Sequence, residues 1–89
     1  MSPEKIKNTI SENLACEFIE IKGDDGTHFE AIIVSKEFEN ISILKQHQLV
    51  YRSLGEMMKK DIHALSIKTY KLDEWNQLTN SGDKKHDNK

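Results

Sequence analysis

The 89-residue sequence predicts an α+β fold: a small mixed three-stranded sheet with helices packed on one face, in the order helix, strand, strand, long helical region, strand, helix. Two segments alternate apolar and polar residues around the turn sequence GDDG, which indicates a hairpin. The stretch after Ser42 repeats apolar residues with helical spacing. A further strand pattern follows at residues 62–69. A helical crossover therefore joins this strand to the hairpin, and the two joined strands are parallel if they are neighbours.

The first element is a short amphipathic helix that begins at Ser2 and Pro3. The Ser2 hydroxyl can cap the first turn, and proline favours the first helical position. Ile6, Ile10 and Leu14 then recur every four residues and form one narrow apolar stripe. Such a stripe is typical of a helix with a single buried face.

The hairpin is predicted from CEFIEIK, residues 16–22, and THFEAIIVS, residues 27–35. Ile19 and Ile21 share one face of the first strand, with charged residues between and after them, as in a half-buried strand. The turn is GDDG, residues 23–26. A G-x-x-G sequence also occurs in KH nucleic-acid domains, but there it joins two helices. Here it lies between strands, and we interpret it as turn geometry.

The long helical region begins after Ser42, whose hydroxyl can cap ILKQHQLVYRSLGEMMKK. Apolar residues at helical spacing predict its buried face: Ile43, Val50, Leu54 and Met57, supported by Leu44, Tyr51 and Met58. Gly55 either weakens this helix or splits it in two.

The last predicted elements are the strand at residues 62–69 and a short closing helix in LDEWNQL. Leu72 and Trp75 are expected to pack back on the sheet. The domain is expected to span residues 1–78. The remaining sequence, TNSGDKKHDNK at residues 79–89, is polar and low in apolar content, so we expect a disordered tail.

Composition argues against several classes of protein. A chain of this length forms one small domain. Its single cysteine, Cys16, cannot form an internal disulfide or a self-sufficient structural zinc site. The charged N-terminus lacks an unbroken apolar run, which argues against a secretory signal or membrane span, so we expect a cytoplasmic protein without membrane contact. No catalytic triad is supported by spacing, and no enzymatic activity is expected.

The charge is unevenly distributed along the chain. Residues 1–41 contain four lysines and nine acidic residues, whereas residues 42–75 contain six basic and four acidic residues. The basic residues of the stretch 42–60 are Lys45, Arg52, Lys59 and Lys60. Such charges usually form a solvated helix face. They are also suited to phosphate contacts on a helix-turn-helix-like surface, which predicts weak DNA binding by a transcriptional regulator, or to orienting a protein partner.

A histidine stands near the start of an apolar strand in DIHALSIKTY, residues 61–70. His63 shares a strand face with Leu65 and Ile67, because side chains alternate between the two faces. A histidine there is a hydrogen-bonded structural residue, a proton carrier or a metal ligand, and the strand pattern leaves all three open. Cys16 starts the first strand, and we interpret it as a small buried hydrophobe.

Four blocks of the sequence resemble the BolA family, especially its short-loop members: GDDGTHFEAIIVSKEFEN, LKQHQLVYRSLGEMM, IHALSIKTY and DEW. They occur in the family's order between Leu14 and Trp75. The resemblance implies a fold like class II KH domains. It also implies a stress-response protein that is a monomer when alone and forms a heterodimer with a monothiol glutaredoxin. The heterodimer shares a two-iron two-sulfur cluster, in cluster trafficking or iron and redox sensing. Some members are described as DNA-binding regulators.

The resemblance also implies site residues. His63 matches the family's cluster-ligating histidine, and a neutral imidazole is a good iron ligand. A glutaredoxin cysteine and a glutathione thiolate would supply the missing ligands, so no cluster is expected in the isolated chain. Many members carry a further Cys or His in the hairpin loop, where this chain has Asp24 and Asp25. His28 is the better candidate, since such clusters favour thiolate and imidazole, and a heterodimer with one ligand from this chain stays open. His47 is expected to pack or hydrogen-bond.

Overall fold

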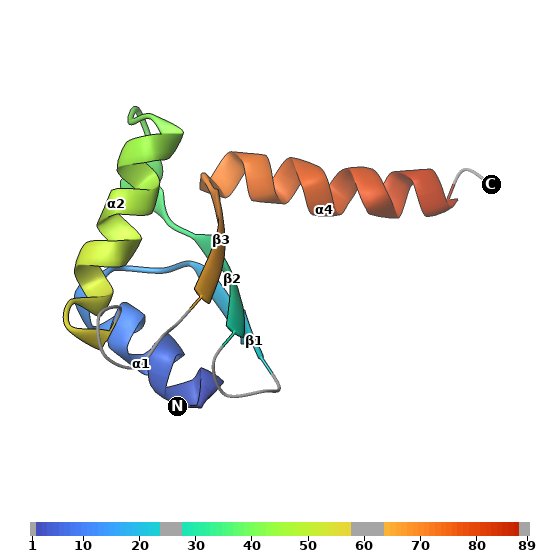
Figure 1. Ribbon diagram of the computed structural model, residues 1–89. Helices are drawn as coiled ribbons and strands as arrows, with labels where there is room; N and C mark the ends of the chain where they lie inside the picture. Colours follow the sequence, from blue (N-terminus) through green and yellow to red (C-terminus); the bar gives the residue numbers. More distant parts are fainter. Residues whose placement is uncertain (1, 24–27, 58–63, 88–89) are drawn as a thin grey trace.

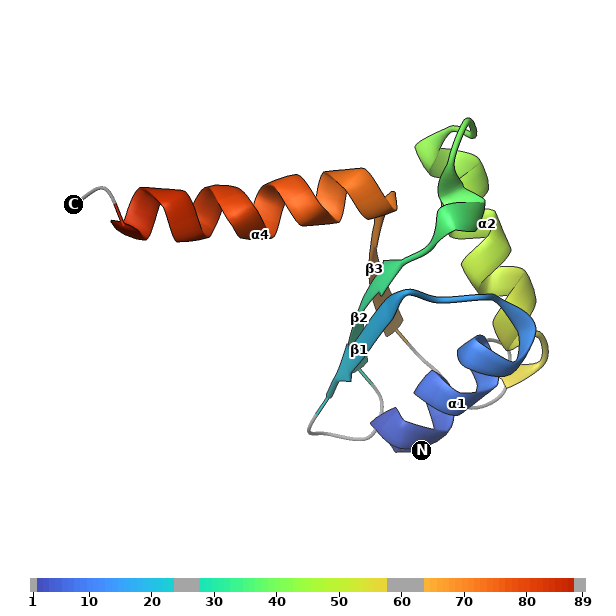
Figure 2. The ribbon, with the colours of Figure 1, turned by 180° about the vertical axis from the view of Figure 1, so that it is seen from behind.

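The computed structural model describes residues 2–23, 28–57 and 64–87 and has the predicted α+β architecture (Figure 1). In chain order the elements are α1 (Pro3–Asn13), β1 (Phe18–Lys22), β2 (His28–Val34), the 3-10 helix η1 (Lys36–Phe38), α2 (Ile43–Leu54), β3 (Ala64–Tyr70) and α4 (Leu72–Asp87). Helices α1 and α2 lie on one side of the sheet, and α4 extends away from the other elements (Figures 1 and 2).

The sheet has the strand order β1-β2-β3 and is mixed. In the antiparallel pair Phe18 lies opposite Val34, and in the parallel pair Val34 lies opposite Tyr70. At the other end of the parallel pair, His28 lies opposite Ala64. The predicted hairpin strands and the predicted parallel crossover are both confirmed. The residues of the turn itself, 24–27, lie outside the described residues.

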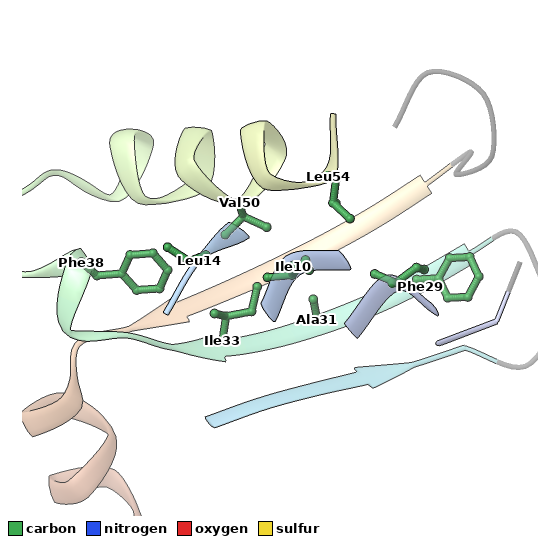
Figure 3. Close-up of a cluster of buried hydrophobic side chains, with 9 residues drawn as sticks. Ile10, Leu14, Phe29, Ala31, Ile33, Phe38, Val50 and Leu54 are labelled. Carbon is green, nitrogen blue, oxygen red and sulfur yellow. The ribbon is translucent and has the colours of Figure 1, made fainter. Parts of the chain in front are cut away.

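The core lies between the sheet and the two helices α1 and α2 (Figure 3). Its buried side chains come from α1 and the residue after it, β2, η1 and α2: Ile6, Ile10, Leu14, Phe29, Ala31, Ile33, Phe38, Val50 and Leu54. The predicted stripe of α1 and the predicted inner face of β1 are confirmed, because Ile19 and Ile21 pack against this cluster. Burial of a large aliphatic or aromatic side chain stabilises a fold by about 1.5–3 kcal/mol, so this cluster is the main stabilising contact of the domain.

Serine side chains cap both core helices. The Ser2 hydroxyl accepts a hydrogen bond from the Lys5 backbone N–H at 3.2 Å, and Pro3 occupies the first turn of α1. The Ser42 hydroxyl accepts one from the Lys45 backbone N–H, also at 3.2 Å. Each bond satisfies a backbone donor that has no partner inside the helix, and both predicted helix starts are confirmed.

The buried face of α2 differs from the predicted one in the first turn. Val50 and Leu54 are buried as predicted, but Ile43 is 57% exposed and Leu44 is 67% exposed. The sequence pattern predicted a buried face along the whole helix. However, α2 begins beyond the end of the sheet, so its first turn has no strand to pack against (Figure 1). The first core position of α2 is instead the polar residue Gln46, which is 2% exposed.

Helix α2 ends where the sequence predicted a weakened or split helix. Gly55 has φ 56° and ψ −127°, a backbone conformation that residues with a Cβ atom rarely adopt. Its N–H still donates to the Tyr51 carbonyl oxygen at 3.1 Å. Met57 is helical again and packs against the core, while Met58 lies outside the described residues. The helical region is therefore split at Gly55.

A buried polar network joins α2 to β3. The Thr69 hydroxyl donates to Gln46 Oε1 at 2.6 Å. Gln46 Nε2 donates to the carbonyl oxygens of Phe38 at 3.1 Å and Ile41 at 3.3 Å. Each buried polar atom of this amide has a partner, so its burial does not carry the cost of an unsatisfied group. The network fixes α2 against β3 and against the segment that precedes α2 in the chain.

Helix α4 begins against the sheet face that α1 and α2 leave uncovered. The Trp75 ring stacks on Phe18 with a centroid distance of 5.0 Å, and its centroid lies 5.4 Å from that of Tyr70. Phe18 and Tyr70 both align with Val34 across the sheet, on the face opposite Ile19, because strand side chains alternate. The predicted packing of Trp75 on the sheet is confirmed, but it occurs on the opposite face from the core helices.

Helix α4 also continues further than the sequence predicted. It extends to Asp87, so most of the polar segment 79–89, predicted to be a disordered tail, is helical. The first turn carries Asp73 and Glu74, whose charges favour a helix N-terminus. Once that turn exists, each added residue gains a hydrogen bond at a lower entropic cost than nucleation.

Within the part of the chain that the structure describes, no helix is long and apolar enough to cross a membrane.

The polar network gives a stability prediction. Thr69→Val leaves Gln46 Oε1 buried without a donor, which we expect to lower the free energy of unfolding by about 1–3 kcal/mol. The matched control is Thr69→Ser, which keeps the hydroxyl and loses one methyl group, at a cost of about 0.8 kcal/mol. Urea denaturation of both variants measures the difference. A Thr69→Val variant as stable as the wild-type chain would show that the hydrogen bond contributes nothing.

Candidate functional site

The candidate site lies at the end of the sheet where β2 and β3 begin. His28 is the first residue of β2, and its side chain is exposed. The next residue, Phe29, is buried in the core, so His28 projects on the open face of the sheet. An open depression adjoins His28 and is lined by Lys22, Gly23, Phe29 and Glu30 as well. The site thus presents one imidazole between a lysine and a glutamate.

Close packing at Gly23 holds the end of β1 beside this histidine. A Cβ atom on Gly23 would lie 2.5 Å from Phe29 Cδ1 and 2.8 Å from the His28 carbonyl oxygen. No side chain fits there without movement of the Phe29 ring or of the strand. The first glycine of GDDG therefore has a structural role in the hairpin, as the sequence interpretation predicted.

Several of the predicted site residues lie outside the described residues: His63, Asp24, Asp25, Lys59 and Lys60. The ligand role of His63 stays a prediction. The residue that follows it in the chain, Ala64, is the one that pairs with His28. Within the described ranges, no three His, Cys, Asp or Glu side chains are grouped so that they could hold a metal ion together.

Cys16 lies at the opposite end of the sheet from His28. The N–H of the next residue, Glu17, donates to the carbonyl oxygen of Val34 at 2.7 Å, and Val34 is the last residue of β2. Because His28 is the first residue of the same strand, the full length of β2 separates the cysteine from the histidine. Cys16 is therefore no part of the candidate site.

The surroundings of Cys16 keep its thiol protonated. Burial raises the pKa of the Cys16 thiol above its ordinary value, and the Glu37 and Glu17 carboxylates raise it further. The thiol Sγ donates to the Leu14 carbonyl oxygen at 3.3 Å, and the side chain packs against the core. A protonated thiol is a poor nucleophile and a poor metal ligand. The interpretation of Cys16 as a small packing residue is supported.

Glu37 anchors the segment between α1 and β1, a role that the sequence analysis did not predict. Glu37 Oε2 accepts a hydrogen bond from the Ala15 backbone N–H at 3.1 Å, and the Ser35 hydroxyl donates to the Ala15 carbonyl oxygen at 2.6 Å. These contacts join residues 20 and 22 positions apart in the sequence, so no local pattern indicates them. They hold the segment before Cys16 against the loop after β2.

The basic residues that the structure describes lie on α2. Lys45 and Arg52 are both exposed, and they are two helical turns apart on one side of the helix. His47 lies between them in sequence and is half-buried, in keeping with the expected packing role. The structure thus places two of the four predicted phosphate-contacting residues on one surface, distant in the fold from the open sheet face that carries His28.

The mixed sheet, the helical crossover and the order of elements define a small α+β domain of the class II KH-like type. Residues 6–74 match the family model described as BolA-like protein. The match covers most of the described domain, and the chain belongs to the BolA-like family. The resemblance carried by the four sequence blocks is confirmed.

Individual relatives show the same relationship. The chain is 36% identical over 76 residues to the acid stress protein IbaG of Escherichia coli, covering 84% of this chain and 89% of that protein. It is 39% identical over 49 residues to the DNA-binding transcriptional regulator BolA of Haemophilus influenzae, covering 55% and 48% of the two chains. The crystal structure of a bol-like protein from Babesia bovis has a TM-score of 0.79 at 27% identity, covering 89% of this chain and 94% of that chain. The two curated relatives are named as a stress protein and a regulator, not as enzymes.

The raised pKa of Cys16 gives a prediction for its reactivity. At pH 8 we expect iodoacetamide to modify Cys16 in the folded chain more slowly than in the urea-unfolded chain, because less thiolate is present. Glu37→Gln removes one of the carboxylates that raise the pKa, so the rate at this pH should increase. Glu20→Gln is the matched control, and mass spectrometry follows the reaction. Equal rates in the folded and unfolded chains at this pH would contradict the assignment.

Proposed function

We propose that this chain is an adaptor that binds a monothiol glutaredoxin and shares a two-iron two-sulfur cluster with it, in iron-sulfur cluster trafficking or in iron and redox sensing. The proposal combines membership of the BolA-like family with one structural observation. Parallel pairing sets His28 opposite Ala64, and Ala64 directly follows His63 in the sequence. His28 and His63 thus become candidates for one site.

The donor atoms near this end of the sheet suit a cluster that needs further ligands from a partner. His28 offers an exposed imidazole, and imidazole replaces thiolate as an iron ligand in some clusters. A two-iron two-sulfur cluster takes four protein or cofactor ligands. We assign His63 as the principal ligand from this chain and His28 as the candidate second ligand. A glutaredoxin cysteine and a glutathione thiolate would complete the set.

The chain's own thiol does not compete for this role. Cys16 lies at the far end of β2, and its pKa is raised rather than lowered. Thiolate ligands are therefore expected from the partner. Lys22, which lines the depression beside His28, contributes a positive charge that favours the anionic thiolate-ligated cluster or a carboxylate of glutathione.

Reconstitution with a glutaredoxin tests the proposal. The chain is mixed with a monothiol glutaredoxin, glutathione, iron and sulfide, and the visible absorption and circular dichroism spectra are recorded. We expect a heterodimer spectrum that differs from that of glutaredoxin alone. His63→Ala should abolish the difference, because it removes the principal ligand. Cys16→Ala, the matched control, should leave the spectrum unchanged.

The outcome for His28→Ala decides the number of ligands from this chain. An altered heterodimer spectrum would make His28 the second ligand, whereas an unchanged one would leave His63 as the single ligand, with surface contacts holding the partner. A wild-type mixture whose spectrum equals that of glutaredoxin alone would contradict cluster sharing. A normal heterodimer spectrum with His63→Ala would contradict the ligand assignment.

A second candidate function is DNA binding by a transcriptional regulator. The Haemophilus influenzae relative is named as a DNA-binding transcriptional regulator. In this chain, Lys45 and Arg52 are exposed on one side of α2, where they are suited to phosphate contacts. The predicted surface also includes Lys59 and Lys60. We rank this function below cluster sharing, because three lysines and one arginine without a placed base-reading residue favour weak, sequence-independent contact.

DNA binding through phosphate contacts depends strongly on salt concentration. If residues 42–60 contact phosphates, the affinity for duplex DNA should fall steeply as salt rises, because binding releases counterions. Replacing Lys59 and Lys60 with glutamine should weaken binding and reduce the slope of affinity against salt concentration by about one unit per lost contact. Fluorescence anisotropy measures both effects. No binding at 20 mM salt, about one-tenth of physiological ionic strength, would remove this candidate.

A further inference from the structure

A groove lies along α2, on the side of the molecule away from the open sheet face. Two hollows form it, each with a volume of about 330 Å³. Both are lined by Glu37, Leu49 and Arg52, so they adjoin each other between α2 and the segment around η1. His28 projects on the opposite face of the sheet, and the groove is a separate feature from the candidate metal site.

The groove combines a cationic wall with an apolar floor. Lys45, Gln48 and Arg52 line it from α2, and all three are exposed. The floor is apolar and consists of Leu14, Ile41 and Leu49. The side chains of Lys45 and Arg52 form no hydrogen bond or ion pair with the residues that the structure describes. Two positively charged side chains therefore lie beside apolar surface without forming an ion pair with any described residue.

The spacing of the two cations sets the length of a matching ligand. Lys45 and Arg52 are seven residues apart on one helix, which corresponds to about 10.5 Å along its axis at 1.5 Å per residue. In an extended chain, side chains four positions apart project on the same face and lie about 13 Å apart, a span that the long, flexible lysine and arginine side chains can match. Gln48 lies between the two cations and carries a side-chain amide that can bond to a peptide backbone. An extended segment with two carboxylates four positions apart therefore fits this wall.

We propose that the groove binds an acidic, extended segment of a partner protein, with its two carboxylates on Lys45 and Arg52 and an apolar side chain on the floor. Exposed apolar residues border the cations: Leu44 is 67% exposed and Tyr51 is 40% exposed. A peptide can cover them with apolar side chains, whereas a nucleic-acid backbone presents a phosphate at every nucleotide and no apolar side chain. Charge and apolar surface together favour the peptide.

The test is an NMR titration of the full, isotope-labelled chain with synthetic six-residue peptides. The first peptide contains two glutamates four positions apart with leucine midway between them, so that all three side chains share one face when the peptide is extended, and the second has glutamine in place of both glutamates. We expect the first peptide to shift amide signals along α2 and around Glu37, and the second to bind at least about five-fold more weakly. Exposed ion pairs contribute about 0.2–1 kcal/mol each, and two of them account for such a ratio.

Variants of this chain locate the binding. Lys45→Glu and Arg52→Glu should each weaken binding of the acidic peptide about five-fold, because an attraction becomes a repulsion. Lys68→Glu is the matched control, since it makes the same change in net charge at an exposed residue of β3 and should leave the affinity unchanged. Glu37→Gln should strengthen binding about two-fold by removing a repulsive carboxylate.

Four results would overturn the proposal. They are no shift at millimolar peptide, equal binding of the glutamine peptide, equal weakening by Lys68→Glu, or shifts of the same amides by a DNA duplex but not by the acidic peptide. The last result would assign the groove to nucleic acid. Circular dichroism of each variant checks that the fold is intact, so a loss of binding refers to the charge that was changed.

Discussion

The parallel pairing of β2 with β3 is the constraint on which the rest of the structure depends. Parallel neighbours cannot be joined by a tight turn, so the chain needs a crossover. Helix α2 supplies it and buries Val50 and Leu54 in the core. The hydrogen bond from Thr69 to Gln46 then ties the crossover to the strand it leads into. The same pairing sets His28, the first residue of β2, beside Ala64, the first residue of β3, which His63 precedes in the sequence.

Most of this arrangement could be predicted from the sequence, because its signals are local. The alternation in β1 and β2, the serine caps and the stripe of Ile6, Ile10 and Leu14 each depend on residues within one element. The parallel crossover followed from the order of the elements. The position of His28 at the start of a strand was also local information. The elements of the fold, and the position of His28 on one of them, could therefore be predicted from short stretches of sequence.

The features that the sequence did not predict depend on contacts between distant elements. Gln46 is buried because Thr69 and two loop carbonyls satisfy its amide, and a hydropathy pattern scores the residue as exposed. Ile43 is exposed because α2 extends past the sheet. The apolar periodicity of a helix does not indicate how far that helix extends beyond the strands it covers. The bond between Glu37 and Ala15 and the stacking of Trp75 on the outer sheet face have the same origin.

The proposed cluster sharing requires that a histidine of this chain binds iron in the shared cluster. The most direct measurement is pulsed electron paramagnetic resonance of the reduced heterodimer, with ¹⁵N-histidine incorporated in this chain alone and an unlabelled glutaredoxin. Since imidazole coordination brings a ring nitrogen to the iron, the account predicts a ¹⁵N hyperfine coupling from this chain, lost with His63→Ala. A reduced cluster in the heterodimer that shows no ¹⁵N coupling would contradict it.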